Sequence, residues 1–286
     1  MALLELVGQV VAVVITAHLL GVFLLLDSDS SRSIRETIRS NLSPVAPEIG
    51  LLVVVLALNG LVRDVSVELS WMIGSNITGH IFALEGQFVA RLQSIANPPL
   101  TAYFSFVYVF GYVFLLTFPF VAYVLHSESR PLRVLLIAYI LNYTIGLLCY
   151  VLFVAYGPRN FMPELVGSLL FTSWPQSQLL TSQVNVNTNV FPSLHTSLSV
   201  TVGLIAYRFR EIHRRWMPVA GVLATSIAVS TMYLGIHWLI DVIAGILVAA
   251  ASVAVALRIT AKRESDRHQR SIVRMTITRW FENIQR

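Results

Sequence analysis

Charged residues are scarce in this chain. Asp, Glu, Lys and Arg make up only 12% of its 286 residues, and Lys262 is the only lysine. An average soluble domain has about 25% charged residues. The chain is also 56% hydrophobic, with a mean hydropathy of +0.71, which argues against an ordinary soluble domain. We therefore expect an all-α fold, a polytopic transmembrane helix bundle that uses the whole chain.

Cysteine is equally scarce. Cys149 is the only one and lies inside an apolar run, so no intrachain disulfide can form and the redox compartment cannot be inferred. Basic residues are lacking ahead of the first long apolar run, residues 3–26. We interpret this run as a retained span and not as a cleaved signal peptide.

Apolar runs of about 20 residues, the length that crosses a bilayer, predict six or seven spans. The expected spans cover residues 3–26, 48–62, 101–125, 132–155, 192–207, 216–233 and 237–257. The second is short for a span; residues 27–47 are expected as a polar loop and 64–100 as interfacial helices or loop. The predicted regions are N-terminal spans with an interfacial segment (1–100), a membrane core (101–257) with its catalytic residues on spans four to seven, and a basic tail (258–286).

Arginines cluster on alternate connections, in residues 27–47, near 130, in 208–215 and in the tail. The positive-inside rule then places the tail in the cytoplasm and the N-terminus outside. The candidate site residues introduced below all fall on the non-cytoplasmic side. In the tail, apolar residues at helical spacing alternate with arginines, which predicts an amphipathic helix that binds anionic lipids at the membrane surface. No nucleic-acid partner is expected.

His237 and Asp241 stand four residues apart at the mouth of an apolar run. On a helix this spacing puts both side chains on one face. A carboxylate bonded to one imidazole nitrogen fixes the tautomer, so the other nitrogen can act as a nucleophile. The alternative is a histidine and an aspartate that only cap a helix start, and the spacing alone does not decide between the two.

A second histidine, His195, opens another apolar run just after Pro192 and Ser193. Asn189 or Ser193 is expected to cap a helix whose first turn contains the proline. Such a helix start, with the Ser193 hydroxyl, suits an anion, and His195 beside it could protonate a departing oxygen. Plain capping with an interfacial histidine is the alternative.

Arg159 follows the fourth expected span on the outer side and could clamp phosphate oxygens. The alternative is an arginine that snorkels from a span end. Together, Arg159, the helix start at Ser193, His237 with Asp241, and His195 supply the donors, nucleophile and acid that phosphoryl transfer needs. We predict no metal site and no cofactor, because no further histidine or carboxylate lies near the ligand types in sequence.

These residues resemble the type-2 phosphatidic acid phosphatase superfamily, which shares its site with the vanadium haloperoxidases. The family motif Pro-Ser-x-His is matched by Pro192, Ser193 and His195. The motif Ser-Arg-x5-His-x3-Asp is matched at Ser230, His237 and Asp241. The resemblance covers roughly residues 100 to 257.

Two departures and two longer patterns are similar to one branch of that family, the inositol-phosphorylceramide synthases. Thr231 stands where the family has an arginine, and Leu152 stands where its Lys-x6-Arg-Pro motif has the lysine. The motif proline is here Pro158, before Arg159. The branch patterns Phe-Pro-Ser-Leu-His and Tyr-Leu-x-x-His-x-x-x-Asp occur at residues 191–195 and 233–241.

The resemblance implies a metal-independent mechanism with two steps. His237 attacks phosphorus to form a phosphohistidine while His195 protonates the leaving group, and water or an alcohol then takes the phosphoryl group. Asp241 orients His237. The expected protein is an integral membrane phosphotransferase of the inositolphosphotransferase-like type, with a lipid phosphate substrate in the bilayer and an alcohol acceptor. A lipid phosphate or polyprenyl pyrophosphate phosphatase remains open, and so does a non-catalytic scaffold or transporter.

For two residues ahead of the third expected span, the sequence gives weaker support for a role in the site. His80 and Glu85 could line the substrate entrance. A loop without a role in the site is the commoner outcome for such residues, so neither is counted among the site residues.

Overall fold

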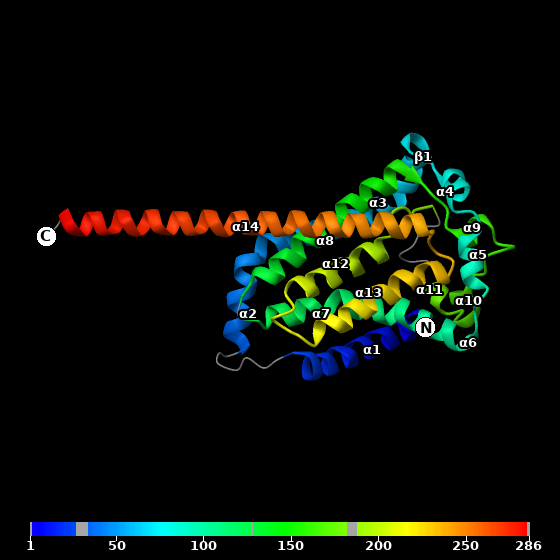
Figure 1. Cartoon of the computed structure of the whole chain (residues 1–286), viewed down its shortest axis with the longest axis horizontal. Helices are drawn as coiled ribbons and strands as arrows, with labels where there is room; N and C mark the ends of the chain where they lie inside the picture. Colours follow the sequence, from blue (N-terminus) through cyan, green and yellow to red (C-terminus); the bar gives the residue numbers. More distant parts are fainter. Residues whose placement is uncertain (1, 27–33, 127, 182–187, 285–286) are drawn as a thin grey trace.

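The long apolar runs form a helix bundle. In the computed structural model, which describes residues 2–26, 34–126, 128–181 and 188–284, six helical segments are long and apolar enough to cross a membrane. These segments are Leu4–Leu25, Ile34–Leu61, Pro98–Val124, Arg130–Leu152, Trp216–Tyr233 and Leu239–Asp266. The prediction of an all-α, polytopic membrane bundle is therefore confirmed (Figure 1).

The N-terminal third is more helical than expected. Helix α1 (Ala2–Leu25) matches the first predicted span, but α2 (Ile34–Leu42) and the 3₁₀ turn η1 (Ser43–Val45) occupy much of the expected polar loop. Helix α3 (Ala46–Ile73) continues past the predicted end at residue 62. No glycine or proline interrupts residues 61–73, and Gly74 ends the helix. The second predicted span lies inside the segment Ile34–Leu61, which is long and apolar enough to cross a membrane because helical residues precede it.

Residues 74–97 contain no span, as predicted. They form strand β1 (Ser75–Asn76) and two short helices, α4 (Thr78–Glu85) and α5 (Phe88–Gln93). Strand β1 pairs in parallel with β2 (Phe153–Val154), which ends helix α8 (Arg130–Leu152) before the predicted boundary at residue 155. The third predicted span is α6 (Pro98–Phe106), a π-helical turn η2 (Val107–Gly111) and α7 (Tyr112–Val124), joined without a break.

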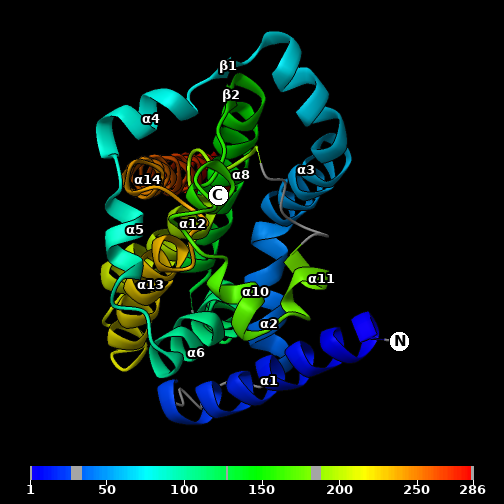
Figure 2. The same cartoon turned by 90° about the vertical axis from the view of Figure 1, so that its right-hand side faces the viewer.

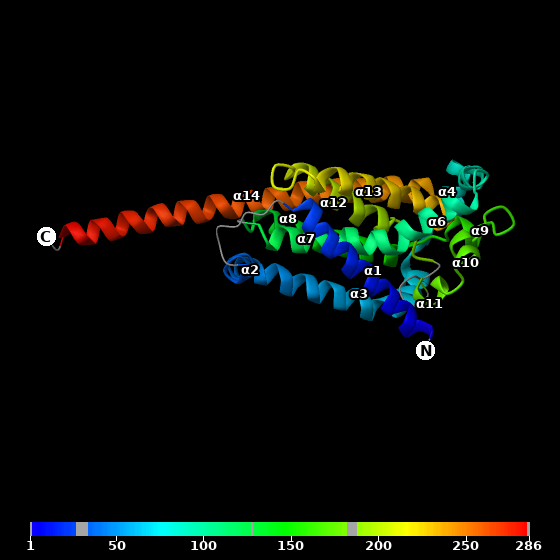
Figure 3. The same ribbon diagram turned by 90° about the horizontal axis from the view of Figure 1, so that it is seen from below.

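The fifth predicted span is a short central helix. Three small helices, α9 (Pro158–Phe161), α10 (Leu169–Ser173) and α11 (Ser177–Thr181), precede α12 (Leu194–Arg208), which has 15 residues. Helix α12 lies beside α8, α13 (Trp216–Tyr233) and α14 (Leu239–Ile284) (Figures 1 and 3). Its buried face carries four small polar residues, Thr196, Ser197, Ser199 and Thr201. Thr196, Ser197 and Thr201 form hydrogen bonds inside the bundle, so the helix need not be uniformly apolar.

Helix α14 begins later and ends later than the last predicted span. It starts at Leu239, so His237 precedes it, and it continues to Ile284. The tail that was predicted as a separate surface helix is therefore continuous with the last span, and Figure 3 shows it extending beyond the bundle. The side chains of residues 270–286, on which the amphipathic prediction rests, lie outside the described part of the chain.

The short helices gather at one end of the bundle. Figure 2 looks onto this end, where α4, α5, α6 and α10 surround the ends of the long helices. The start of α12, the end of α13 and the start of α14 all lie here (Figure 1). The connections rich in arginine, between α7 and α8 and between α12 and α13, lie at the opposite end. This arrangement brings the chemistry-bearing segments together.

An ion-paired cluster holds α3, α8 and α14 together at the opposite end. Glu48 is 5% exposed and contacts Arg133 Nε at 3.4 Å and the Arg263 guanidinium. Arg133 also donates to the Pro44 carbonyl at 2.7 Å. Because Arg133 is buried, its charge depends on Glu48 for compensation.

Replacing Glu48 with alanine should lower the free energy of unfolding by about 3–5 kcal/mol, because Arg133 would be left buried without its partner. The measurement is denaturant unfolding of the purified protein in detergent. The matched control is Glu211→Ala, which removes an exposed ion pair with Arg214 and should change stability by less than about 0.5 kcal/mol. Equal effects of the two substitutions would show that the cluster does not hold the helices.

Candidate active site

The turn between α13 and α14 positions His237. The N–H groups of Ile236 and His237 donate to the Thr231 carbonyl at 2.9 and 3.0 Å. Gly235 has φ +72°, and a Cβ there would lie 2.7 Å from Val166 Cγ1. The turn therefore needs glycine at this position. Thr231, where the resembling family has an arginine, serves this turn through its backbone.

Asp241 contacts His237, although not in the predicted way. His237 lies before α14, so the two residues do not share a helix face; the carboxylate instead reaches back from the first turn. Asp241 Oδ2 accepts the Trp238 N–H at 2.9 Å and lies 3.4 Å from His237 Nδ1. This is the geometry of an acidic residue at the third helical position that bonds the N-cap backbone. Capping and orientation of His237, which the sequence left as alternatives, are thus combined in one side chain.

His237 is held as a neutral imidazole. It is 3% exposed. Burial lowers its pKa to about 3; the backbone at Val190 acts in the opposite direction, and the charge of Arg159 lowers the pKa further. An unprotonated imidazole is the form that can attack an electrophile.

Ser193 caps α12, as predicted, with Pro192 just outside the helix and not in its first turn. The Ser193 hydroxyl accepts the Thr196 N–H at 3.3 Å and donates to Thr196 Oγ1 at 3.0 Å. The hydroxyl proton that was expected to serve an anion is thus directed at Thr196. The Ser193 N–H donates to the Asp241 carbonyl at 3.1 Å, which ties the two motifs together.

His195 stands in the first turn of α12 and faces His237. The two ring centroids are 6.0 Å apart. His195 also packs against Tyr108 at 4.8 Å and Tyr112 at 4.6 Å between centroids. Both tyrosines lie at the π-helical turn, a kind of irregularity often found at functional sites. The sequence offered only an aromatic-rich span as a signal for them, and they were not predicted.

Arg159 lies in the short helix α9, next to the same turn. Its N–H donates to the Gly235 carbonyl at 3.0 Å, and its guanidinium carbon lies 4.5 Å from the centroid of the Phe171 ring. Burial lowers the pKa of the guanidinium. Its Nη1 atom is buried without a hydrogen-bond partner among the described residues. A buried donor of this kind fits an anion that the site would receive.

The structure thus brings Arg159, His195, His237 and Asp241 to one end of the bundle, with Ser193 beneath them as a helix cap. Leu152, which the motif spacing places at the lysine position, is 49% exposed. Within the described residues, no group of three or more His, Cys, Asp or Glu side chains could hold a metal ion.

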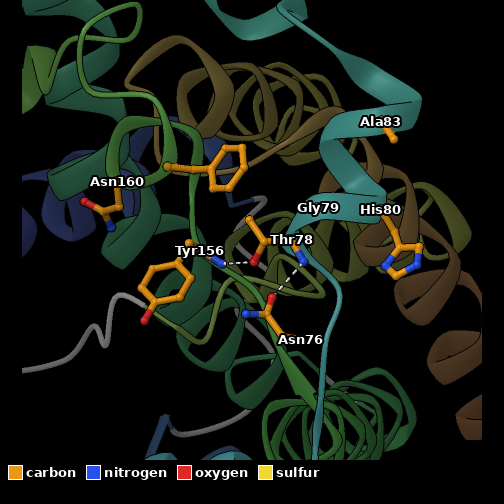
Figure 4. Close-up of a pocket in the computed structure, with 8 residues that line it drawn as sticks. Asn76, Thr78, Gly79, His80, Ala83, Tyr156 and Asn160 are labelled. Atoms are coloured by element: carbon orange, nitrogen blue, oxygen red, sulfur yellow. Dashed lines mark hydrogen bonds between the residues drawn. The ribbon is translucent and has the colours of Figure 1, made fainter.

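A cavity of about 600 Å³ lies next to the site, between α4 and residues 156–161 (Figure 4). Asn76, Thr78, His80, Tyr156 and Asn160 are among its lining residues. His80 lines this cavity, whereas Glu85, which was predicted to line the entrance with it, contacts the start of α14. The Tyr156 N–H donates to Thr78 Oγ1 at 3.0 Å, which joins the two walls.

A comparison with family models gives one match. The model described as the PAP2 superfamily matches residues 82–255, which begin inside α4, well before the predicted limit near residue 100. No curated protein and no solved structure gives a significant match.

Proposed function

The chain belongs to the PAP2 superfamily, which supports a phosphatase or phosphotransferase type of enzyme acting on lipid phosphates, and we propose that His237 carries the phosphoryl group in this reaction. In this proposal the protein is an integral membrane enzyme that transfers or hydrolyses a lipid-linked phosphate ester through a phosphohistidine. The reaction uses side chains only and needs no metal.

One observation carries the proposal. Two imidazoles, His195 and His237, face each other at 6.0 Å, beside the unpartnered Nη1 of Arg159. This arrangement supports the roles of nucleophile, acid and cationic donor to one phosphate. A helix-capping pair alone would require neither the second histidine nor the buried guanidinium.

The first step breaks the bond between phosphorus and the leaving oxygen. His237 Nε2 attacks phosphorus with its lone pair while Nδ1–H faces Asp241 Oδ2. His195 takes up a proton as the anionic substrate enters and gives it to the departing oxygen. Arg159 binds the phosphoryl oxygens, and Ser193 fixes the helix turn that carries His195.

The second step breaks the phosphorus–nitrogen bond. His195, now neutral, takes the proton of an incoming hydroxyl, whose oxygen attacks phosphorus, and Nε2 recovers its lone pair. We propose an alcohol as the acceptor, of the inositolphosphotransferase-like type. The support is that threonine and leucine replace two family cations at Thr231 and Leu152. Fewer cations suit a phosphodiester better than a monoester dianion.

Water as acceptor is the second candidate. It would make the protein a lipid phosphate or polyprenyl pyrophosphate phosphatase. The same histidines serve both reactions, so the products distinguish them. A scaffold or transporter without catalysis is the third candidate.

We further propose the orientation that the arginine distribution supports, with the site on the non-cytoplasmic face and the C-terminus in the cytoplasm. Anionic lipids at the basic residues beyond 257 would then be partners of the tail. A lipid substrate could keep its chains in the bilayer while its phosphate reaches the membrane-water boundary.

The test is product analysis with the purified full chain. Lipid phosphates, lipid pyrophosphates and phosphodiester lipids are supplied in detergent micelles with and without a polyol such as inositol. A new head-grouped lipid supports transfer, and free phosphate alone supports the phosphatase. Absence of turnover with all three substrate classes would favour the scaffold and contradict the proposal.

A further inference from the structure

Helix α4 ends against the first turn of α14. The two carboxylate oxygens of Glu85 accept hydrogen bonds from consecutive backbone groups there. Oε1 accepts the Leu239 N–H at 2.9 Å, and Oε2 accepts the Ile240 N–H at 3.1 Å. The first N–H groups of a helix have no partner within the helix and must be satisfied from outside. For α14, a residue 154 positions earlier in the chain supplies that partner.

Glu85 and Asp241 divide the N-terminus of α14 between them. Asp241 Oδ2 accepts a hydrogen bond from the Trp238 N–H and contacts His237 Nδ1. The Glu85 carboxylate accepts hydrogen bonds from the next two N–H groups along the helix. Without Glu85, the Leu239 and Ile240 N–H groups would lose their acceptor, and the carboxylate of Asp241 stands in the same first turn of the helix. Asp241 Oδ1 is buried without a hydrogen-bond partner among the described residues. Glu85 therefore prevents a competition that would turn Asp241 away from His237.

The electrostatic setting agrees with this role. Burial raises the pKa of Glu85, the two N–H groups lower it, and the charge of Asp241 raises it again. The positive end of a helix stabilises a carboxylate at its N-terminus. Two carboxylates at the start of α14 also repel a phosphate there. A phosphate is therefore expected to bind at Arg159 and the start of α12.

A second contact holds the His237 turn at the end of α13. Gln93, in α5, donates from Nε2 to the Tyr233 carbonyl at 2.9 Å and accepts the Gly167 N–H at 2.8 Å. Tyr233 ends α13 and Glu85 reaches the start of α14, so residues 78–93 contact both ends of the His237 turn. The segment that was expected as interfacial helices or loop is thus part of the site's support.

We propose that Glu85 is a positioning residue for the phosphoryl transfer. By capping α14 it fixes the turn at His237 and keeps Asp241 on the imidazole. This inference rests on the proposed function for its effect on turnover, but the capping itself can be measured without any substrate.

The first experiment compares turnover in Glu85→Gln, Glu85→Ala and Glu164→Gln. Glu164 is an exposed acid outside the contacts described here and serves as the matched control. We expect kcat to fall about 10-fold in Glu85→Gln, which keeps one acceptor oxygen, and about 100-fold in Glu85→Ala, with KM within twofold. A misplaced nucleophile lowers kcat, whereas a lost substrate contact raises KM.

The second experiment measures backbone amide exchange of residues 236–243 in the same proteins without substrate. Faster exchange in Glu85→Ala than in Glu164→Gln supports the cap. Unchanged exchange, or a kcat within twofold of the wild-type value, would overturn the inference. If no variant and no wild-type protein turns over substrate while exchange still increases, the cap stands and the proposed function fails. If Glu85→Ala does not fold, the Glu85→Gln measurements decide.

Discussion

Replacing His237 with alanine is expected to lower phosphoryl transfer by about 10⁴-fold or more, because the nucleophile that accepts phosphorus is removed. The substitution leaves the turn's backbone bonds to Thr231 in place, so the fold should persist. Turnover and covalent labelling by a radiolabelled phosphate ester measure the effect. The wild-type label should be acid-labile and alkali-stable, as phosphohistidine is, and absent from His237→Ala.

The control for His237 is His18→Ala. His18 lies in α1, contacts Thr117 at 3.2 Å, and packs its ring against Phe114 and Phe118. Its loss should leave labelling unchanged. Retention of the label in His237→Ala would move the nucleophile elsewhere and contradict the mechanism.

The pH dependence follows from the state of His237. Because its pKa is lowered to about 3, the rate should not fall between about pH 7 and 5 through protonation of this group. In that range the unfolded chain binds a proton that folded His237 does not. Stability contributed by this residue is therefore lost as the pH decreases.

Replacing His195 with asparagine should slow cleavage by about 10²–10⁴-fold when the leaving group is an alkyl alcohol, because that oxygen needs a proton as it departs. A nitrophenyl leaving group departs without protonation, so the first step should be nearly normal with it. The second step still needs His195 as a base. Phosphohistidine should therefore accumulate as a burst in this variant.

The control for His195 separates acid catalysis from packing. Tyr108 and Tyr112 enclose the ring, and asparagine leaves a gap between them. A purely structural defect would lower the burst rate equally for the alkyl and nitrophenyl substrates. That result would contradict the assignment of His195 as the acid, while His18→Asn should change neither rate.

Much of the fold could be predicted because a membrane span is a local property of the chain. The span at residues 216–233 was predicted to the residue, and the family match confirms the superfamily that the two histidine motifs resemble. The errors fall where hydropathy is uninformative. The helix between residues 62 and 73 is not apolar enough to signal a span. Helix α12 can carry hydroxyl side chains because Asn142 and Ser193 bond three of them inside the bundle.

Contacts within the candidate site could be predicted where the residues are close in sequence. The spacing of His237 and Asp241 indicated their contact, although the geometry is a helix start and not a helix face. The cap at Ser193 was also predicted, because capping depends on only a few neighbouring residues. The direction of its hydroxyl was not, since Thr196 competes for it.

The sequence alone indicated the membrane bundle, the two histidine motifs and Arg159 as a candidate phosphate ligand. Only the tertiary structure decided that His195 faces His237, that Arg159 Nη1 has no partner among the described residues, and that Glu85 caps α14. The physical reason is the range of the interactions. Hydropathy and capping act within a few residues, whereas a carboxylate that bonds a backbone 154 positions away depends on how the whole bundle packs.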